Sequence, residues 1–350
     1  MDYPKARRIT QRHIAERAAV SQSVVSLVLN GKADAISRIP KGTRDRVMAV
    51  IRETGYVADP AARRLAGVGN KIFGVFTYEP AFADNSTDFY TPLLLGIEAK
   101  AEELGCDLLM FTSAPVENGR RRIFHENNRL ALADGCLLLG REMAHDDLLR
   151  LVESRLPFVA VGRRDVEGVP YVGVDYVAAT SELARRAREL GHERFYYLHF
   201  DSPAESVRDR KRAMDDLRAL PFVEVAIRAS DGTDIAADWA AIREFRPTVL
   251  FVDRAERAES LYRLATEAGL AIPGDLSMVV LEETSQADGR GVDFTRLSPP
   301  RGLLGSSAVG LLGRILSSND NPSGSELRTL LDCEVKDGAT LAVPNKGNVL

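Results

Sequence analysis

Residues 9–31 read ITQRHIAERAAVSQSVVSLVLNG, and this stretch decides the fold at the start of the chain. Its apolar residues recur at helical spacing in two short groups, with a brief break between them. Thr10 and Ser21 stand where helix N-caps are expected, and Asn30-Gly31 is typical of a helix end. The stretch therefore predicts two short helices joined by a tight turn.

A further helix is predicted over about 43–55, because Val47, Val50 and Ile51 fall on one helical face. Three short helices around a small core, two of them joined tightly, are typical of a helix-turn-helix module. At 350 residues the chain is also long for one compact domain. We therefore expect a small all-α head, residues 1–58, followed by a larger body.

Charge is distributed unevenly between these two parts. Residues 1–71 hold 14 Lys and Arg against 6 Asp and Glu, whereas the remaining residues hold 32 against 44. The first part is basic and the rest is acidic, although the whole chain has a net charge of only −4. This asymmetry favours a polyanion as the partner of the head and a different partner for the body.

The head resembles that of the LacI/GalR (lactose-repressor) family of bacterial transcription regulators. The matching residues run in order along the chain: Ile9-Thr10, Ile14-Ala15, Ala18, Val20-Ser21, Val25-Ser26, Val28-Leu29-Asn30-Gly31, Thr43-Arg44, Val47, Ile51 and Gly55-Tyr56. The resemblance implies that the second helix lies in the major groove of DNA. The DNA-contacting residues that it implies for the head are Thr10, Ser21, Gln22, Ser23, Ser26, Leu27 and Asn30.

Gln22, Ser23 and Leu27 are the positions that the resemblance assigns to base reading. A glutamine amide can pair bidentately with adenine, and a serine hydroxyl can donate or accept. Leu27 departs from the family, in which many members carry an arginine that reads guanine. Leucine offers only apolar contact, for instance to a thymine methyl group, so we expect a different operator preference at that step.

Two further departures concern the backbone of the head. Ala19 stands where the family usually has glycine in the turn, and the loop 32–42 is longer than the family norm. The loop adds Lys32, Arg38 and Lys41, which either reach phosphates or lie on a solvated surface loop.

Residues 59–69 form a short, alanine-rich segment that is prone to be helical, and Pro60 suits its first turn. A helix this short is not stable alone in water, which fits a hinge helix that folds only on DNA. The resemblance assigns Leu65 to a wedge in the minor groove, with Ala62 packed beside it, and Arg63 to a phosphate.

From Lys71 short apolar strands alternate with amphipathic helices, which predicts parallel sheets covered by helices on both faces. We predict strands at 72–77, 106–112, 135–139, 158–161, 172–175, 195–199, 224–227, 249–252 and 277–281. We predict helices at about 92–104, 119–132, 146–154, 177–190 and 208–219, and two more that end at 245 and 268.

The pattern restarts at Val172, which predicts an α/β body, residues 70–345, of two doubly wound parallel-sheet lobes like those of a periplasmic sugar-binding protein. The expected lobes are about 70–168 plus 296–325 and about 169–293 plus 326–345. The family resemblance extends into the body through Phe89-Tyr90, Gly96-Ile97-Glu98, Asp134-Gly135, Pro157-Phe158-Val159, Val172-Gly173-Val174-Asp175 and Leu190-Gly191-His192.

Ligands of open parallel sheets bind beyond the carboxyl ends of the strands, where two lobes face each other. The candidate ligand-binding residues at these ends are Phe89, Tyr90, Asp175, Arg210, Asp253 and Glu282. The resemblance assigns Arg210 to ligand hydroxyls or carboxylates. Asp253, Glu282 and Tyr176 depart from the family. We therefore expect a sugar-like effector first, with a cationic or nitrogenous ligand as the alternative.

Motifs of common enzyme classes are missing from the sequence, which has no Walker loop, GxSxG or HExxH motif. We expect no enzyme, no catalytic residue, no cofactor and no metal. Cys106, Cys136 and Cys333 are widely separated and fit buried apolar positions. The sequence shows no secretory signal and no apolar run of the roughly 20 residues that a membrane helix needs, so we expect a cytoplasmic protein without a membrane partner.

These patterns together predict a sequence-specific transcription regulator, expected to be a repressor, whose operator affinity is controlled by a small molecule bound between the lobes. A head of this size contacts one half-site, so we expect a homodimer on a near-palindromic operator, joined through the first lobe and its helix at 93–104. The alternative is a solute-binding protein of the periplasmic type without DNA regulation, against which the basic head argues. Whether the effector is an inducer or a corepressor stays open.

Overall fold

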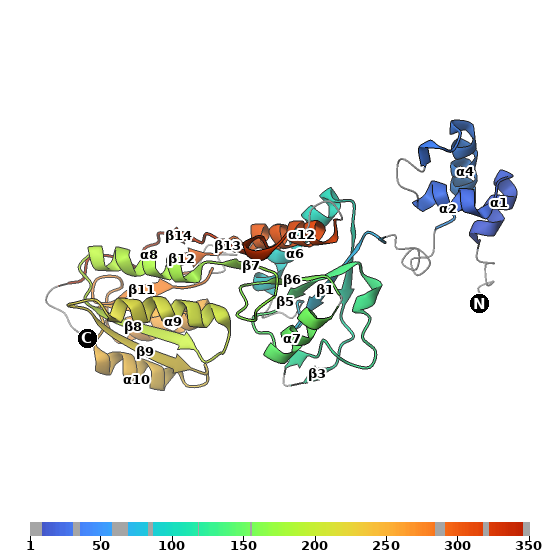
Figure 1. Ribbon diagram of the computed structural model, residues 1–350. Helices are drawn as coiled ribbons and strands as arrows, with labels where there is room; N and C mark the ends of the chain where they lie inside the picture. The colour runs from blue at the N-terminus through green and yellow to red at the C-terminus, as the bar shows by residue number, and fades with distance from the viewer. Residues whose placement is uncertain are drawn as a thin grey trace, which may run out of the picture. The chain divides into compact units, whose positions relative to one another are not determined.

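The computed structural model describes residues 9–30, 36–57, 69–82, 87–117, 119–154, 156–283, 291–317 and 322–345. The chain divides into two compact units (Figure 1), a head of Met1–Ile72 with Leu132–Asp134 and a body of Phe73–Ala131 with Gly135–Leu350. Among the described residues, no helix is long and apolar enough to cross a membrane.

The head consists of the helices α1 (Gln11–Ala18), α2 (Gln22–Asn30) and α4 (Lys41–Thr54). They pack around a small core whose buried members are Ile14, Ala15, Ala18, Val25 and Val47. All three predicted helices are confirmed. The last one begins slightly earlier than predicted and ends, as predicted, at Gly55, which adopts the left-handed conformation of a C-cap.

The turn between α1 and α2 places Ala19 in the left-handed region, at φ 53° and ψ 50°. The N–H of Val20 donates to the carbonyl of Ala15 at 3.0 Å and closes the turn. A residue with a Cβ in this conformation carries a strain of about 1–2 kcal/mol. The turn therefore keeps its shape without the usual glycine, at a cost to the stability of the head.

The first sheet of the body has the strand order β13-β7-β6-β5-β1-β2. Its strands are β1 (Ile72–Thr77), β2 (Asp107–Phe111), β5 (Gly135–Leu139), β6 (Phe158–Val161), β7 (Tyr171–Val174) and β13 (Arg328–Leu331). Apolar side chains on one face pack against α6 (Thr87–Glu103) and α12 (Arg301–Leu316). The helix α7 (His145–Glu153) covers the opposite face (Figure 1).

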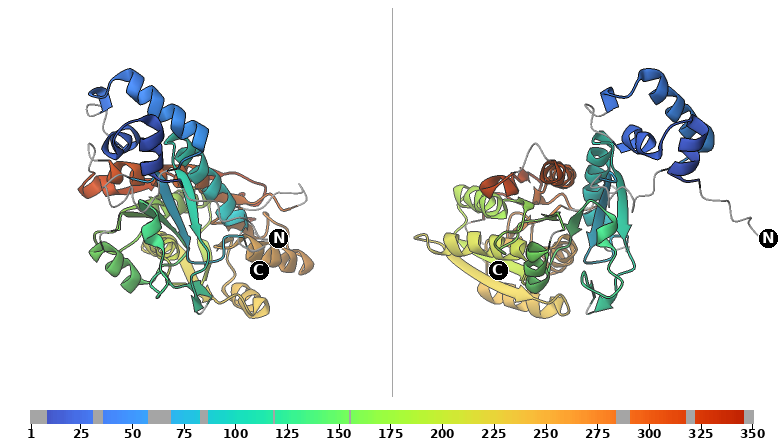
Figure 2. Two further views of the ribbon diagram at one scale, coloured as in Figure 1. Left: turned by 90° about the vertical axis from the view of Figure 1, so that its right-hand side faces the viewer. Right: turned by 45° about the vertical axis from the view of Figure 1, so that its right-hand side comes forward.

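The second sheet has the strand order β14-β12-β11-β10-β8-β9. Its strands are β8 (Arg194–Phe200), β9 (Glu224–Ser230), β10 (Val249–Val252), β11 (Ser277–Val280), β12 (Thr295–Ser298) and β14 (Glu334–Lys336). Only β14 is antiparallel to its neighbour among these described strands. Figure 2 shows this two-sheet arrangement of the body from two further sides.

Alternating side chains of the second sheet point to opposite faces and bury two different pairs of helices. Phe195 and Tyr197 face α8 (Tyr176–Glu189) and α9 (Glu205–Arg218). Their neighbours in β8, Tyr196 and Leu198, pack with residues of the other two helices. These two helices are α10 (Ile235–Phe245) and α11 (Ala255–Glu267). The doubly wound arrangement predicted for each lobe is confirmed.

The backbones of α6 and α12 touch each other on the first sheet. A Cβ atom added to Gly96 would lie 1.9 Å from the carbonyl oxygen of Gly302, and one added to Gly305 would lie 2.3 Å from that of Leu93. No side chain fits at either position without displacing a backbone. The two helices therefore form a closely packed pair.

The helix predicted over residues 119–132 is wrong. The described chain instead forms a short hairpin, β3 (Val116–Glu117) and β4 (Arg120–Arg121), and a 3-10 turn, Leu130–Leu132. The Asn128 side chain donates to the carbonyl of Ile123 at 2.6 Å and accepts the N–H of Leu130 at 2.8 Å. These bonds to the backbone replace the helical hydrogen bonds.

The expected lobe boundaries also need correction. The strand β7, expected to open the second lobe, pairs with β6 and β13 in the first sheet. The strand β12 belongs to the second sheet. The chain therefore passes between the sheets after β7, β12 and β13, in each case later than predicted. The sequence of a strand carries no local signal of the sheet that it joins.

Candidate functional site

The helix α2 presents an exposed edge on the surface of the head. Gln22, Ser23 and Leu27 are exposed, whereas Val25 on the same helix is buried in the core. The hydroxyl of Ser21 accepts a backbone N–H of the first turn at 3.3 Å and so caps the helix. One face of α2 is thus fixed, and the other offers an amide, a hydroxyl and an aliphatic side chain to a partner.

Two of the other residues predicted to contact DNA are placed by the structure. Thr10 is exposed at the start of α1, where its N–H donates to the His13 ring at 3.2 Å, and Ser26 is half-buried. Outside the described residues lie the side chain of Asn30 and the hinge residues Ala62, Arg63 and Leu65. The wedge in the minor groove therefore stays a prediction from the family resemblance.

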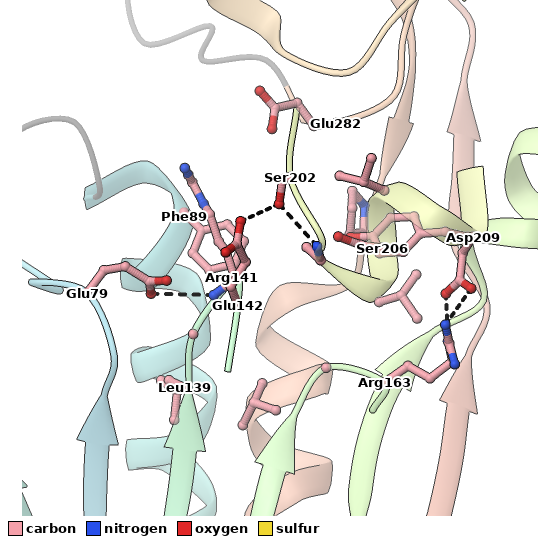
Figure 3. A pocket seen from close by; sticks show the side chains of 18 of the residues that line it. Glu79, Phe89, Leu139, Arg141, Glu142, Arg163, Ser202, Ser206, Asp209 and Glu282 are labelled. Carbon is pink, nitrogen blue, oxygen red and sulfur yellow. Dashed lines mark hydrogen bonds and ion pairs between the residues drawn. The ribbon is translucent and has the colours of Figure 1, made fainter. Parts of the chain in front are cut away.

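A cavity of about 290 Å³ opens in the body between the two sheets (Figure 3). Its walls come from the segments that follow the carboxyl ends of the strands: 140–142 after β5, 162–164 after β6, 202–206 after β8 and 253–254 after β10. The first turns of α6 and α12 add Phe89 and Arg301. Open parallel sheets in general bind their ligands at this edge, beyond the carboxyl ends of the strands.

Four of the six predicted ligand-binding residues line this cavity, namely Phe89, Arg210, Asp253 and Glu282. Tyr90 and Asp175 do not. The Tyr90 ring is buried and its hydroxyl donates to Glu79, and burial raises the pKa of this phenol. Asp175 caps α8 by accepting the N–H of Ala178 at 2.9 Å. Both side chains therefore hold neighbouring residues in place without lining the cavity themselves.

Arg210 of α9 and Asp253 after β10 lie side by side in the wall. The Nη1 atom of Arg210 lies 3.9 Å from Oδ1 of Asp253, and its guanidinium lies 4.2 Å from the centre of the Tyr176 ring. The Asp253 carboxylate accepts closer hydrogen bonds from the Tyr197 hydroxyl, at 2.7 Å, and the N–H of Phe200, at 3.2 Å. Asp253 is thus bound mainly to its own sheet.

The Arg210 side chain keeps a hydrogen-bond donor unused. The residue is only 7% exposed, and its buried Nε has no partner among the described residues. Burial lowers the pKa of Arg210, but the acidic groups around it, Asp253 first among them, together outweigh this effect and the pKa lies above its ordinary value. The cavity therefore contains a buried positive charge with spare donors.

Glu282 is held at the start of a helix. Its Oε1 accepts the N–H of Ala255 at 2.8 Å, in the first turn of α11. The positive end of a helix dipole stabilises a carboxylate at this position. The charge of Glu282 is therefore compensated without a ligand.

Two guanidinium groups contact the Phe89 ring. The guanidinium of Arg141 lies 4.7 Å from the ring centre, and that of Arg301 lies 5.1 Å from it. Figure 3 shows the Arg141 side chain running alongside the ring. Such cation–π contacts orient a guanidinium while leaving its N–H groups available to a ligand.

Ion pairs across the cavity join the two sheets. Arg163, which follows β6, makes two bonds to Asp209 of α9, at 2.7 and 2.6 Å. Arg164 pairs with Glu205, one turn earlier on α9, at 3.0 Å. Arg164 and Glu205 are both buried. The helix that carries Arg210 is therefore tied to the first sheet by two adjacent arginines.

Sequence reasoning missed these arginines of the wall. Arg141 comes directly after Gly140 at the end of β5, and Arg163 and Arg164 come after Gly162 at the end of β6. The rule that placed Asp253 and Glu282 at strand ends applies equally to these positions. The family resemblance singles out none of these arginines, so only the strand-end rule could have found them.

Comparisons with known proteins match both parts of the chain. Residues 10–59 match the family model described as bacterial regulatory proteins, lacI family, and residues 184–340 match a periplasmic binding protein-like domain. The HTH-type transcriptional regulator CelR of Thermobifida fusca is 28% identical over 347 residues, which cover 93% of this chain and 98% of the relative.

Solved structures show the same fold. A lac repressor dimer bound to operator and the anti-inducer ONPF matches with a TM-score of 0.74 at 19% identity, over 96% of this chain and all of the other. A complex of the regulator CelR with cellobiose matches with a TM-score of 0.61 at 23% identity, over 95% of this chain and all of the other.

Proposed function

The chain belongs to the lacI family of bacterial regulatory proteins, and on this premise we propose that it is a repressor controlled by a small molecule in the cavity. This effector either releases the repressor from its operator or holds it there. The family consists of DNA-binding transcription regulators rather than enzymes. The observation that carries the proposal is the exposed edge of α2. It lies inside the segment that matches the family's DNA-binding region.

In this proposal α2 enters the major groove with Gln22, Ser23 and Leu27 towards the bases. An amide and a hydroxyl can read base edges, and Leu27 favours a thymine methyl group. The test is selection of duplexes from a random library by the full chain, followed by a salt titration of the selected site. Enrichment of a near-palindrome supports the proposal. Recovery of random sequences with no enrichment would overturn it.

A homodimer follows from the size of the head, because one α2 reads one half-site and a near-palindrome needs two. Leu95 on α6 and Leu303 on α12 are 59% and 56% exposed, and we place the dimer surface on these helices. The double variant with Leu95→Glu and Leu303→Glu should sediment as a monomer and lose operator affinity. A variant that remains a dimer would move the interface elsewhere.

The effector that we propose is a polyhydroxylated molecule. A relative of the same fold is described in complex with cellobiose, and the cavity wall offers the Phe89 ring and the hydroxyls of Ser202 and Ser206. Arg210→Ala should abolish the response to the effector and preserve operator binding. A normal response in that variant would place the effector site elsewhere.

A regulator of this kind acts on chromosomal DNA, so we propose that the protein is located in the cytoplasm.

Control by an effector requires two arrangements of the body that bind it with different affinity. The pairs Arg163–Asp209 and Arg164–Glu205 join the sheets across the cavity, so we place the difference in these contacts. Operator affinity measured with and without saturating effector decides between an inducer and a corepressor. An effector that leaves operator affinity unchanged would remove the regulatory part of the proposal.

A further inference from the structure

Positive side chains outnumber negative ones in the wall of the cavity. Among the described residues, seven arginines and five carboxylates line it. Four of the arginines have a carboxylate within ion-pair distance: Arg120 with Glu142, Arg163 with Asp209, Arg164 with Glu205 and Arg210 with Asp253. The three other arginines of the wall are Arg141, Arg254 and Arg301. The excess positive charge of the cavity therefore depends on how these three are compensated, and Arg141 and Arg254 are considered first.

Arg141 and Arg254 have no ion pair with a carboxylate in the described part of the chain. Their guanidinium groups rest instead on aromatic rings, that of Arg141 on Phe89 and that of Arg254 on Phe200, each 4.7 Å from the ring centre. An aromatic face attracts a cation but does not neutralise it. Both side chains are half-buried, so water compensates them only in part.

The charges of Arg141 and Arg254, neither of which is in an ion pair among the described residues, also act on each other. Burial lowers the pKa of Arg254, and the positive charge of Arg141 lowers it further, whereas the charges of Glu282 and Asp253 raise it in part. An arginine does not lose its proton under ordinary conditions. Glu282 and Asp253 offset part of the repulsion between the two arginines, and an anion bound between them would relieve the rest.

The carboxylates of the wall, by contrast, already have partners. Glu79 accepts the hydroxyl of Tyr90, Glu142 accepts that of Ser202, and Glu282 caps α11. A cationic ligand would have to compete for these acids and would meet the arginines. The charge distribution thus disfavours the cationic alternative.

We propose that the effector is an anion, a polyhydroxylated molecule with a carboxylate or phosphate group that Arg141 and Arg254 bind. Arg210 adds spare donors in the same wall, with its buried Nε unpartnered. Guanidinium groups match the oxygens of either anion in bidentate geometry. This inference rests on the proposed effector site, and it makes sugar acids or sugar phosphates the preferred class.

The first experiment needs no knowledge of the natural effector. The thermal midpoint of the full chain is measured with inorganic phosphate and with acetate, against chloride at equal ionic strength. Phosphate or acetate should stabilise the wild type. The double variant with Arg141→Gln and Arg254→Gln should lose this stabilisation. The variant Arg212→Gln, which changes an exposed arginine on α9, should keep it. Equal stabilisation of wild type and double variant would overturn the proposal.

A second readout distinguishes a binding role from a structural role. The double variant without ligand should melt close to the wild type, because relief of the repulsion between Arg141 and Arg254 offsets the loss of their contacts with Phe89 and Phe200. A large fall in its midpoint without ligand would show that these arginines hold the fold, and would also overturn the proposal.

The ligand class is then resolved by titration with gluconate, glucose 6-phosphate, glucose and glucosamine. One of the two anions should bind at least about tenfold more tightly than glucose, the scale of a charged hydrogen bond. Gluconate and glucose 6-phosphate separate a carboxylate from a phosphate. Tighter binding of glucose or glucosamine would sink the anion inference.

Operator binding in the presence of each compound keeps the two proposals apart. If glucose alone changes operator affinity, the effector site stands and the anion inference fails. If an anion binds through Arg141 and Arg254 but no anion changes operator affinity, the anion inference stands and the proposed regulation fails.

Discussion

The exposed edge of α2 and the cavity of the body are candidate binding sites built in opposite ways. Ser23 and Leu27 stand four residues apart on one helix, so the helical period alone brings them to one face, and Gln22 precedes them on the exposed side. The cavity wall joins Phe89 of α6 to Arg301 of α12, which lie near opposite ends of the body sequence. The residues of a site on one helix can be predicted from their spacing in the sequence. The residues of a site made of many segments can be predicted only once the topology of the sheets is known.

The largest expected effect comes from a variant that should abolish the DNA-binding site of the head and leave the cavity of the body intact. Val25 is fully buried in the small core of the head, and Val25→Asp would bury an unpaired charge at a cost of several kcal/mol. A domain this small has little stability to lose. We expect the head to unfold and specific operator binding to vanish, while the melting of the body is unchanged. Fluorescence anisotropy and circular dichroism measure the two effects.

Leu27→Ala is the matched control, because Leu27 is an exposed residue of the same helix. The head of this variant should remain folded. Persistent specific binding by Val25→Asp would show that the packing of α2 does not hold its exposed edge in place.

A second variant tests the long-range construction of the cavity. Glu205→Gln removes the partner of the buried Arg164, and breaking a buried ion pair costs about 3–5 kcal/mol. Urea unfolding should show a body less stable by about this amount, with the head transition unmoved. Glu224→Gln, in an exposed pair with Arg194, should cost under about 1 kcal/mol. Equal losses of stability in the two variants would refute the structural role of the Arg164–Glu205 ion pair.

Gln22→Ala sharpens the comparison on the side of the head. Loss of a bidentate base contact should weaken binding to the selected operator by about 1–3 kcal/mol and relax the preference at one base pair of each half-site. The slope of affinity against salt should stay the same, because glutamine carries no charge. A uniform loss at all base pairs would contradict base reading by this side chain.

The smallest expected effect is a gain in stability. Ala19→Gly relieves the left-handed strain of the turn and should stabilise the head by about 0.5–1 kcal/mol after the entropy of glycine is counted. Ala49→Gly, in the exposed middle of α4, should destabilise it by a similar amount. Thermal melting of the head measures both. A gain at Ala49 or a loss at Ala19 would contradict the assigned strain.

The sequence predicted two kinds of element well. The helices of the head have apolar residues at helical spacing, and the buried strands β5, β6 and β10 are short uninterrupted apolar runs. Residues 119–132 failed because Asn128 binds the backbone with its side chain, which no period records. The passages between the sheets were misplaced because the pairing of β7 with β13 joins residues distant in sequence.

The candidate cavity was predicted only in part, for the same reason. Arg210 and Asp253 were found through strand ends and family resemblance, and both line the cavity. The significance of Arg141 and Arg254 depends on which carboxylates lie near them. Glu142 and Asp209 are bound by Arg120 and Arg163, and only the folded chain shows that these acids are already taken.

The contact between α6 and α12 has a mechanical consequence. Because the backbones meet at Gly96 and Gly302 with no side chain between them, the helix pair has almost nothing compressible along its seam. One end of the pair carries Phe89 and Arg301 at the cavity, and its outer side carries exposed leucines. We therefore expect the two helices to move as one rigid block. A displacement at the cavity end would then tilt the whole pair, including its outer side, instead of changing the packing between the helices.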